Sequence, residues 1–208
     1  HVLDVPLHFR FHEASHGGGG FDMRKLLSGT LLERRPDRAV TFVDNHDTQP
    51  RQALASFVSS WFKPLAYALI LLRAEGLPCV FSLDYEGGAY TDGGQADGEA
   101  HVEIPAHKEI LDTLLAIRRD VAHGPQHDYF DDPDVVGWTR LGDDDHPPAM
   151  AVLLTDADGG EKWMDVARPG ATFRDRTGHV DGTVQANDDG WAPFRVNGGS
   201  VSVWVEEA

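Results

Sequence analysis

The sequence has one cysteine in 208 residues, few positive charges and no apolar run long enough to span a membrane. A single cysteine cannot form an intrachain disulfide, so Cys79, which stands in an apolar run, is expected in the core. Lys and Arg number 18 against 34 Asp and Glu, which gives a net charge of −16. This charge argues against nucleic-acid phosphates and anionic membranes. We therefore expect no nucleic acid and no membrane among the partners, whereas neutral sugars are compatible with the charge.

The first 125 residues alternate between apolar runs, which favour strands, and amphipathic patterns, which favour helices. This alternation predicts a parallel sheet with right-handed crossovers. Pro64 lies inside one helical pattern, where it either kinks the helix or begins a new one at its first turn. Strands are expected at residues 2–5, 40–43 and 77–83, and helices from Pro6 and at 23–31 and 54–75. Apolar residues between 110 and 117 mark a further helix that is expected to end near Gly124.

The pattern changes after residue 125, where short strand patterns alternate with turn sequences such as Asn197-Gly198-Gly199. This predicts an antiparallel β-sandwich and divides the chain into domains at 1–125 and 126–208. In the last strand, alternating valines indicate that one face is buried. The strands are expected at residues 135–140, 149–155, 162–166, 171–174, 183–185, 192–196 and 200–205.

One strand pattern runs directly into a polar cluster, Phe42-Val43-Asp44-Asn45-His46-Asp47-Thr48. In a βα unit, functional side chains stand where a strand ends and its loop begins, and His46 and Asp47 occupy that place. The acidic, glycine-rich stretch 84–103 also follows a strand, so it either lies on the same face or is a mobile surface loop.

Two other groups of residues have spacings typical of metal sites. His8 and His12 are four residues apart and would share a helix face, but no Glu follows His8 as a metalloprotease motif requires. Short-spaced aspartates occur at 132–134 and 156–158. Carboxylates in loops suit Ca²⁺, which takes oxygen ligands. The alternative is that these are ordinary turn aspartates.

Five further runs of the chain bear on its family: DVPLHF at 4–9, FDMRKLL at 21–27, WFKPLAYA at 61–68, QHDYF at 126–130 and NGGSVSV at 197–203. With the His46-Asp47 motif, they resemble the α-amylase family, glycoside hydrolase family 13, in its bacterial liquefying and cytoplasmic types. The resemblance implies the last three βα units of a (β/α)8 TIM barrel, followed by an antiparallel Greek-key β-sandwich. It also implies that Asp47 is the third catalytic carboxylate and that His46 binds the sugar at the cleavage point.

The same resemblance implies endo-hydrolysis of internal α-1,4-glucosidic bonds in starch or glycogen, with retention of configuration. No counterpart of the family's nucleophilic Asp or acid/base Glu is found in the sequence. We therefore expect a C-terminal portion that is inactive alone and has the missing N-terminal part of the same enzyme as its partner. The alternatives are a family member that makes specific maltooligosaccharides or transglycosylates, and a non-catalytic fragment that binds sugar or is structural. A cytoplasmic location is expected, with secretion as the alternative.

The resemblance also implies a calcium ion between the two domains. Its ligands would be the side chains of Asp134 and Asp156 and the main-chain carbonyls of Gly19, Phe21 and Pro133.

Overall fold

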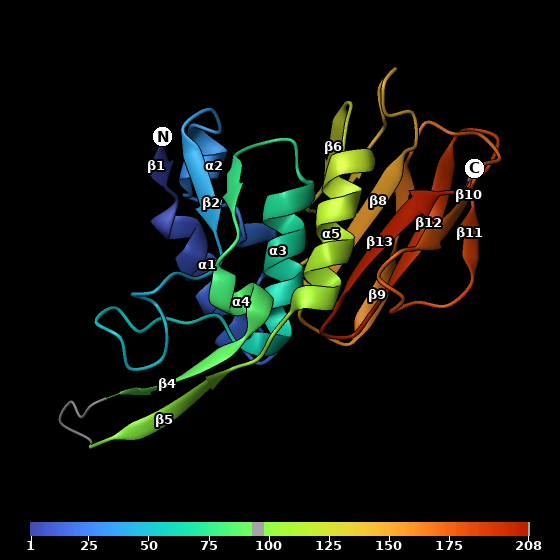
Figure 1. Ribbon diagram of the computed structural model, residues 1–208. Coiled ribbons are helices and arrows are strands. Elements are labelled where there is room, and N and C mark those ends of the chain that lie inside the picture. Colours follow the sequence, from blue (N-terminus) through green and yellow to red (C-terminus); the bar gives the residue numbers. More distant parts are fainter. Residues whose placement is uncertain (93–97, 208) are drawn as a thin grey trace.

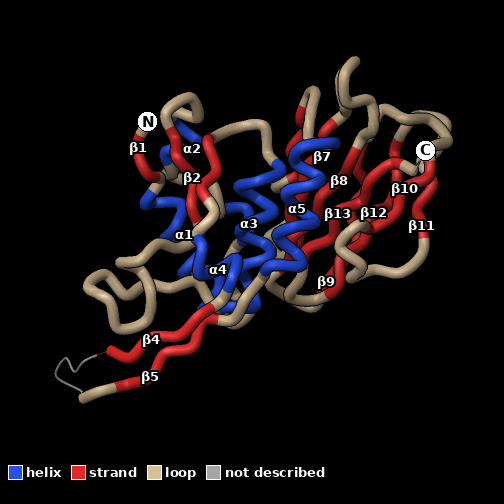
Figure 2. The backbone as a smooth tube through the Cα atoms, in the orientation of Figure 1, coloured by secondary structure: helices blue, strands red, loops and turns tan. Residues whose placement is uncertain are grey.

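The computed structural model describes residues 1–92 and 98–207. Its first part combines helices with a small parallel sheet, and its second part consists of antiparallel sheets (Figure 1). Helices α3 and α5 lie between the parallel strands and the antiparallel sheets (Figure 2). Among the described residues, no helix combines the length and apolar character needed to cross a membrane.

The parallel sheet contains β1 (Val2–Leu3), β2 (Ala39–Phe42) and β3 (Leu77–Cys79), in that order. Val2 pairs with Ala39 and Val40 pairs with Leu77, and both ladders are parallel. The prediction of three parallel strands is confirmed. The first and third strands are shorter than expected, because the chain turns into helices α1 and α4 soon after each of them.

Helix α1 (Val5–His16) begins as its sequence predicts, with Pro6 in the first turn. The carboxylate of Asp4 accepts hydrogen bonds from the backbone amides of Leu7, Leu31 and Leu32. One buried aspartate therefore caps α1 and fixes the segment that begins α2 (Leu31–Arg34).

The helix predicted at 23–31 is wrong. The structure has a single 3-10 turn, η1 (Met23–Lys25), and then the short α2. Gly29 has a φ of +76°, which ends the first turn, and Thr30 caps α2 by accepting the amide of Glu33.

The helix predicted at 54–75 is wrong in its first half. Helix α3 (Lys63–Leu72) follows the 3-10 turn η2 (Ser60–Phe62), and residues 49–59 form turns and loop. Pro64 lies in the first turn of α3, so the alternative in which it begins a new helix is confirmed. A proline ring clashes with the carbonyl four residues earlier, so it does not allow the helix to extend backwards.

The segment after β3 contains more structure than the sequence predicts. Helix α4 (Ser82–Glu86) replaces the end of the expected strand, and β4 (Gly88–Asp92) pairs antiparallel with β5 (Ala100–Ile104). The expectation of a loop at 84–103 is therefore wrong for its described residues; residues 93–97 lie outside them. Helix α5 (Lys108–Asp120) follows; it includes the apolar residues that predicted it, and it ends four residues before Gly124.

The second part of the chain contains two antiparallel sheets. One has six strands in the order β11-β10-β13-β8-β7-β6, and the other pairs β9 with β12. Each predicted strand is present to within a few residues, and β6 is an addition. The strands are β6 (Gln126–Tyr129), β7 (Val135–Arg140), β8 (Met150–Thr155), β9 (Gly159–Asp165), β10 (Thr172–Asp175), β11 (Thr183–Gln185), β12 (Trp191–Asn197) and β13 (Val201–Glu206).

The six-stranded sheet is covered on both faces. Val203 of β13 belongs to a core shared with α1, α3 and α5, whereas the next residue, Trp204, belongs to a core shared with β9 and β12. The prediction that the valine face of the last strand is buried is confirmed, since the helices of the first part cover it. The opposite face, which the alternation pattern left for solvent, is buried as well, because β9 and β12 cover it.

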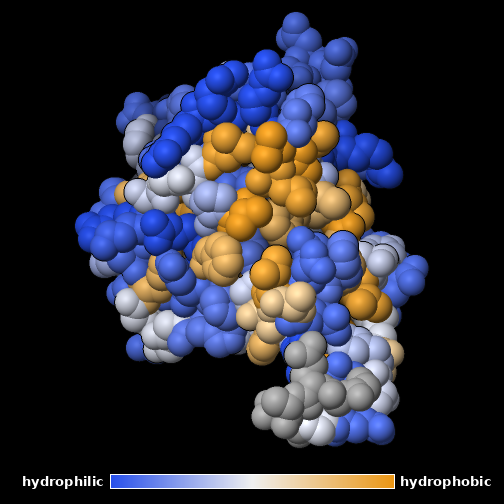
Figure 3. All heavy atoms as spheres, turned by 90° about the vertical axis from the view of Figure 1, so that its left-hand side faces the viewer, coloured by the Kyte–Doolittle hydropathy of each residue, from blue (hydrophilic) through white to orange (hydrophobic). Residues whose placement is uncertain are grey.

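Apolar side chains are exposed where the parallel sheet ends. Val2 and Leu3 of β1, Phe9 of α1 and Leu77 of β3 are 46–64% exposed. Figure 3 shows apolar side chains gathered on the face formed by this side of the molecule. Cys79 is also exposed, so the prediction that it lies in the core is wrong. Its strand is an edge strand of the described sheet, with no neighbour on its outer side.

Candidate functional site

His46 and Asp47 lie together in the loop that follows the carboxyl end of β2. Nε2 of His46 is 3.5 Å from Oδ1 of Asp47, and the two side chains are 85% and 49% exposed. The loop is held by Asn45, whose Oδ1 accepts the amides of Asp47 at 2.8 Å and Thr48 at 3.2 Å. Both predicted side chains are therefore accessible to a ligand, on a loop whose backbone is fixed from within.

Asp44 fixes the same loop from its buried side. It is buried, and its Oδ1 accepts the hydroxyl of Thr48 at 2.9 Å. The amide of Val58 lies 3.3 and 3.4 Å from its two oxygens, which ties the end of the following loop to the strand. Asp44 is therefore a structural partner within the loop.

A buried lysine from α3 completes this arrangement. Nζ of Lys63 lies 3.0 Å from Oδ2 of Asp44 and also pairs with Asp84, which accepts the hydroxyl of Tyr67 at 2.7 Å. Burial raises the pKa of Asp44, the negative charge of Asp84 raises it further, and the Lys63 ammonium opposes both. Burial and the Asp84 charge also raise the pKa of Tyr67, so its hydroxyl stays protonated as a donor. Neither Lys63 nor Asp84 was identified from the sequence.

His8 joins the strand end to the loop at 54–58. Its Nδ1 lies 2.6 Å from the carbonyl of Val43, and its Nε2 lies 2.9 Å from the hydroxyl of Ser56. Burial lowers the pKa of His8. Nδ1 of His12 lies 2.8 Å from the carbonyl of Phe57. Both ring nitrogens of His8 are occupied, so the His8–His12 spacing does not form a metal site.

The β4–β5 hairpin lies beside the same loop. Nε of Arg51 is 2.8 Å from Oδ2 of Asp92, and the hydroxyl of Tyr90 donates to the carbonyl of Pro50 at 2.5 Å. Arg51 has a φ of 64°, which an arginine adopts only when its surroundings hold it there. The hairpin is therefore fixed next to the residues that follow Asp47, which agrees with the alternative that places 84–103 on the active-site face.

The five residues expected to hold calcium meet where the 17–22 loop contacts the second part of the chain. The amide of Phe21 donates to Oδ2 of Asp156 at 3.2 Å. A Cβ on Gly19, whose φ is +80°, would lie 3.1 Å from the carbonyl oxygen of Asp156. The carbonyl of Pro133 accepts the amide of Met23 at 2.7 Å. The loop is thereby fixed against both aspartate-containing turns.

The side chain of Asp156 is the part of this site that points most clearly to a bound cation. Its Oδ1 is buried and has no hydrogen-bond partner among the described residues. Burial raises the pKa of Asp156, and the negative charge of Asp134 contributes to the increase. A buried oxygen without a donor, next to a second carboxylate, fits a divalent cation with oxygen ligands.

Comparisons with known proteins agree with this arrangement. Residues 151–205 match the family described as Alpha-amylase C-terminal. The chain is 52% identical to an α-amylase of Geobacillus stearothermophilus over 98% of its length and 51% identical to an α-amylase of Bacillus licheniformis over 99%. It is 44% identical to the cytoplasmic α-amylase of Escherichia coli K12 over 99%. The chain spans 36%, 39% and 42% of the lengths of these relatives.

Solved structures show the same fold at lower identity. Wild-type α-amylase I from Eisenia fetida superimposes with a TM-score of 0.68 and 15% identity, over 97% of this chain and 48% of that structure. Its E249Q mutant in complex with maltohexaose gives a TM-score of 0.72 over the same shares of the two chains. The sequence matches and the structural matches together show that the chain corresponds to the C-terminal portion of an α-amylase of glycoside hydrolase family 13.

Proposed function

We propose that this chain is the part of an α-amylase that supplies the third catalytic carboxylate, Asp47, for endo-hydrolysis of internal α-1,4-glucosidic bonds in starch or glycogen. The observation that supports this proposal most directly is the accessible His46–Asp47 pair at the carboxyl end of β2. In this proposal, β1, β2 and β3 are the last three strands of a (β/α)8 barrel, and the antiparallel sheets form a Greek-key sandwich.

The chemistry assigns distinct roles to the two side chains. A retaining glycosidase uses a nucleophilic carboxylate and an acid/base carboxylate about 5–5.5 Å apart, and its transition state resembles an oxocarbenium ion. Asp47 accepts hydrogen bonds from sugar hydroxyls, and these bonds strengthen as the ring distorts toward the transition state. His46 donates to a hydroxyl of the same sugar. With one of the three carboxylates, the isolated chain is expected to be inactive.

In this proposal the partner of the chain is the missing N-terminal part of the same enzyme. The exposed apolar face supports this choice of partner. Parallel sheets are normally covered on both faces, and an open strand edge pairs readily with another strand. Here Leu77 of β3 is 54% exposed and Val2 of β1 is 64% exposed, at the two outer strands of the sheet. The remaining barrel strands would cover both positions.

We also propose that calcium binds at the junction of the two parts. The side chains of Asp134 and Asp156 and the carbonyls of Gly19, Phe21 and Pro133 would hold it. The support is the unpartnered Oδ1 of Asp156 and the neighbouring Asp134 carboxylate, whose mutual repulsion a divalent cation would neutralise. A bound ion would join the 17–22 loop to the second part of the chain.

A maltooligosaccharide-forming activity is the second candidate, because the chain is also 48% identical to a glucan 1,4-alpha-maltohexaosidase of Bacillus sp. strain 707 over 99% of its length. This identity is close to the values for the enzymes named α-amylase. Transglycosylation is a third candidate, and a non-catalytic role in sugar binding or structure is a fourth. A cytoplasmic location stays a prediction.

The test is a chimera in which this chain replaces the matching part of the Bacillus licheniformis α-amylase, to which it is 51% identical. The chimera should hydrolyse starch, whereas the isolated chain should not. Chain length of the products separates endo-hydrolysis from maltohexaose formation and transglycosylation. A folded chimera without hydrolytic activity would contradict the catalytic role and favour a non-catalytic one.

A further inference from the structure

The segment that follows Asp47 folds back on itself, and Arg51 lies at its turn. The amide of Leu54 donates to the carbonyl of Asp47 at 3.1 Å, and the amide of Ser56 donates to the carbonyl of Thr48 at 2.9 Å. These two hydrogen bonds close the loop, and Arg51 lies between its two arms. We propose that Arg51 positions the Asp47 carboxylate by fixing this loop to the β4–β5 hairpin, an inference that rests on the proposed catalytic role of Asp47.

The side chain of Arg51 contacts both arms of the hairpin. Its Nε lies 2.8 Å from Oδ2 of Asp92, the last residue of β4. Its Nη2 donates at 2.6 Å to the carbonyl of Gly98, two residues before β5. A third contact has its donor on the hairpin, because the hydroxyl of Tyr90 donates to the carbonyl of Pro50 at 2.5 Å. The loop and the hairpin are thus joined at several points.

The ion pair between Arg51 and Asp92 is partly shielded from solvent. Its two side chains are 26% and 15% exposed, whereas those of the surface pair Arg35–Asp37 are 59% and 57% exposed. Solvent screens a pair of charges less as the pair becomes buried. The Arg51–Asp92 pair is therefore stronger than an ordinary surface pair and able to hold two segments together.

The backbone of Arg51 is strained. Its φ of +64° lies in the left-handed region, which residues with a side chain rarely adopt. Such a conformation persists where its surroundings hold it, and here these include the ion pair with Asp92 and the hydrogen bond to Gly98. Without these contacts the backbone would relax at Arg51, and Leu54, which binds the carbonyl of Asp47, would move with it.

The Asp47 carboxylate depends on its own backbone for its position. Its side chain is 49% exposed, and the ion-pair partner that the described residues give it is His46, which is itself 85% exposed. The backbone is held from both sides, because Oδ1 of Asn45 accepts the amide of Asp47 and the carbonyl of Asp47 accepts the amide of Leu54. The second of these bonds lies on the side of the loop that Arg51 fixes.

The position of a catalytic carboxylate affects the rate strongly. A displacement of about 1 Å can lower a rate on the order of 100-fold. A contact made mainly in the transition state affects kcat, whereas a contact made equally in the ground state affects KM. Loss of Arg51 should therefore lower kcat with little change in KM. A hairpin that only adds binding surface for the substrate would give the opposite result.

The test uses variants of the chimera described above, with kcat and KM measured on starch. Arg51→Gly removes the side chain and keeps the positive φ without strain, and Asp92→Ala removes the partner. Each should lower kcat by about tenfold or more, with little change in KM or melting temperature. Arg51→Lys keeps the positive charge and should recover part of the lost kcat.

The same substitution in the Asp47→Asn chimera shows whether Arg51 acts through Asp47. There Arg51→Gly should lower kcat no further, because the carboxylate that it positions is gone. An equal loss in both backgrounds would overturn the proposal, as would wild-type kcat in both Arg51→Gly and Asp92→Ala. Should Arg51→Gly not fold, Asp92→Ala provides both comparisons.

The two proposals can fail separately. If Asp47→Asn keeps the wild-type kcat, the proposed function fails and the role of Arg51 fails with it. If Asp47→Asn loses activity while Arg51→Gly and Asp92→Ala keep theirs, only the role of Arg51 fails.

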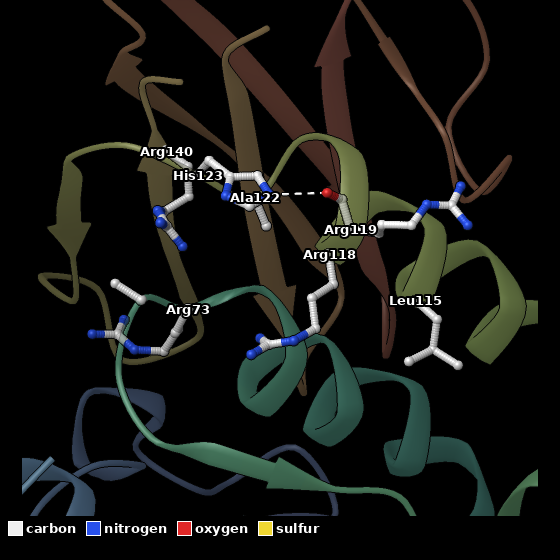
Figure 4. A pocket seen from close by; sticks show the side chains of 8 residues that line it. Arg73, Leu115, Arg118, Arg119, Ala122, His123 and Arg140 are labelled. Atoms are coloured by element: carbon white, nitrogen blue, oxygen red, sulfur yellow. Dashed lines mark hydrogen bonds between the residues drawn. The ribbon is translucent and has the colours of Figure 1, made fainter. Parts of the chain in front are cut away.

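The control is Arg119→Ala. Arg119 forms an exposed ion pair with Asp120 at the end of α5 that lies away from the β4–β5 hairpin (Figure 1). Its guanidinium points away from those of Arg73, Arg118 and Arg140, which line one pocket (Figure 4). This variant should leave kcat unchanged. A loss of kcat as large as that of Arg51→Gly would overturn the assignment of a specific role to Arg51.

Discussion

The ammonium of Lys63 lies 3.0 Å from the carboxylate of Asp44, directly beneath the loop that carries His46 and Asp47. The same ammonium pairs with Asp84, and all three side chains are buried. A single positive charge thus holds two carboxylates from different segments. The position of the candidate catalytic loop depends on this ion pair, because Asp44 binds Thr48 within the loop and the amide of Val58 after it.

Replacing that lysine tests the dependence. Lys63→Met leaves two buried carboxylates without a counter-charge, and breaking a buried pair in this way costs about 3–5 kcal/mol. Urea unfolding of the chimera measures the loss. Lys108→Met is the matched control, because Lys108 forms an exposed pair with Asp112 and its removal should leave the midpoint almost unchanged. Similar midpoints for the two variants would mean that the buried pair does not stabilise the fold.

His8 should make stability depend on pH. Burial places its folded-state pKa below the unfolded value of 6.5, so the unfolded chain binds the proton more readily. The contribution of His8 is therefore fully present above pH 6.5 and is lost as the pH falls from there through the folded-state pKa. Unfolding free energies of wild type and His8→Gln between pH 8 and about pH 5 should diverge at high pH and converge on acidification. A constant difference over this range would contradict the prediction.

Calcium should reverse the effect of Asp156→Asn. The folded-state pKa of Asp156 lies above 3.8, so ionised Asp156 lowers the free energy of unfolding at neutral pH unless a cation compensates. This destabilisation is absent below pH 3.8 and grows as the pH rises through the folded-state pKa. With chelator, Asp156→Asn should be at least as stable as wild type. With Ca²⁺ at a hundredfold excess over Kd, wild type should gain about 2.7 kcal/mol that the variant lacks. Melting temperatures of both proteins in both conditions decide this, and an identical chelator-induced shift would show that Asp156 binds no calcium.

Leu77 should matter only when the rest of the barrel is present. It is 54% exposed on the edge strand β3, so Leu77→Ser should change the stability of the isolated chain little. In the chimera, where a neighbouring strand covers this edge, the same substitution should cost about 1.5–3 kcal/mol. Leu54→Ser is the control, because Leu54 is 65% exposed in a loop and should have little effect in either protein. Equal effects of Leu77→Ser in both proteins would show that this edge is not covered.

The strands and the loop carrying His46 and Asp47 were predictable because their signals are local. An apolar run followed by a polar cluster predicts a strand end wherever it occurs, and β7 and β11 begin and end where the sequence predicts. The helix at 23–31 failed for an equally local reason, the positive φ of Gly29, which outweighs the leucines around it.

Other features depend on residues far apart in the sequence. Lys63 and Asp84 are 21 residues apart, and no local pattern indicates that they share one buried site. Both faces of β13 are buried because β9 and β12 cover the face that carries Trp204, which an alternation pattern cannot reveal. His123 and His146 stack only because Gly124 and Gly142 let their segments touch.

Starch hydrolysis by the Asp47→Asn variant of the chimera tests the central claim most directly. The kcat should fall by on the order of 100-fold or more, since Asp47 contacts the sugar mainly in the transition state, and the melting temperature should stay the same because the side chain is half exposed. Asp37→Asn is the control at the opposite end of β2, where Asp37 pairs with Arg35 and Arg38, and it should leave kcat unchanged. An Asp47→Asn chimera that keeps half or more of the wild-type kcat would contradict the catalytic role of this carboxylate.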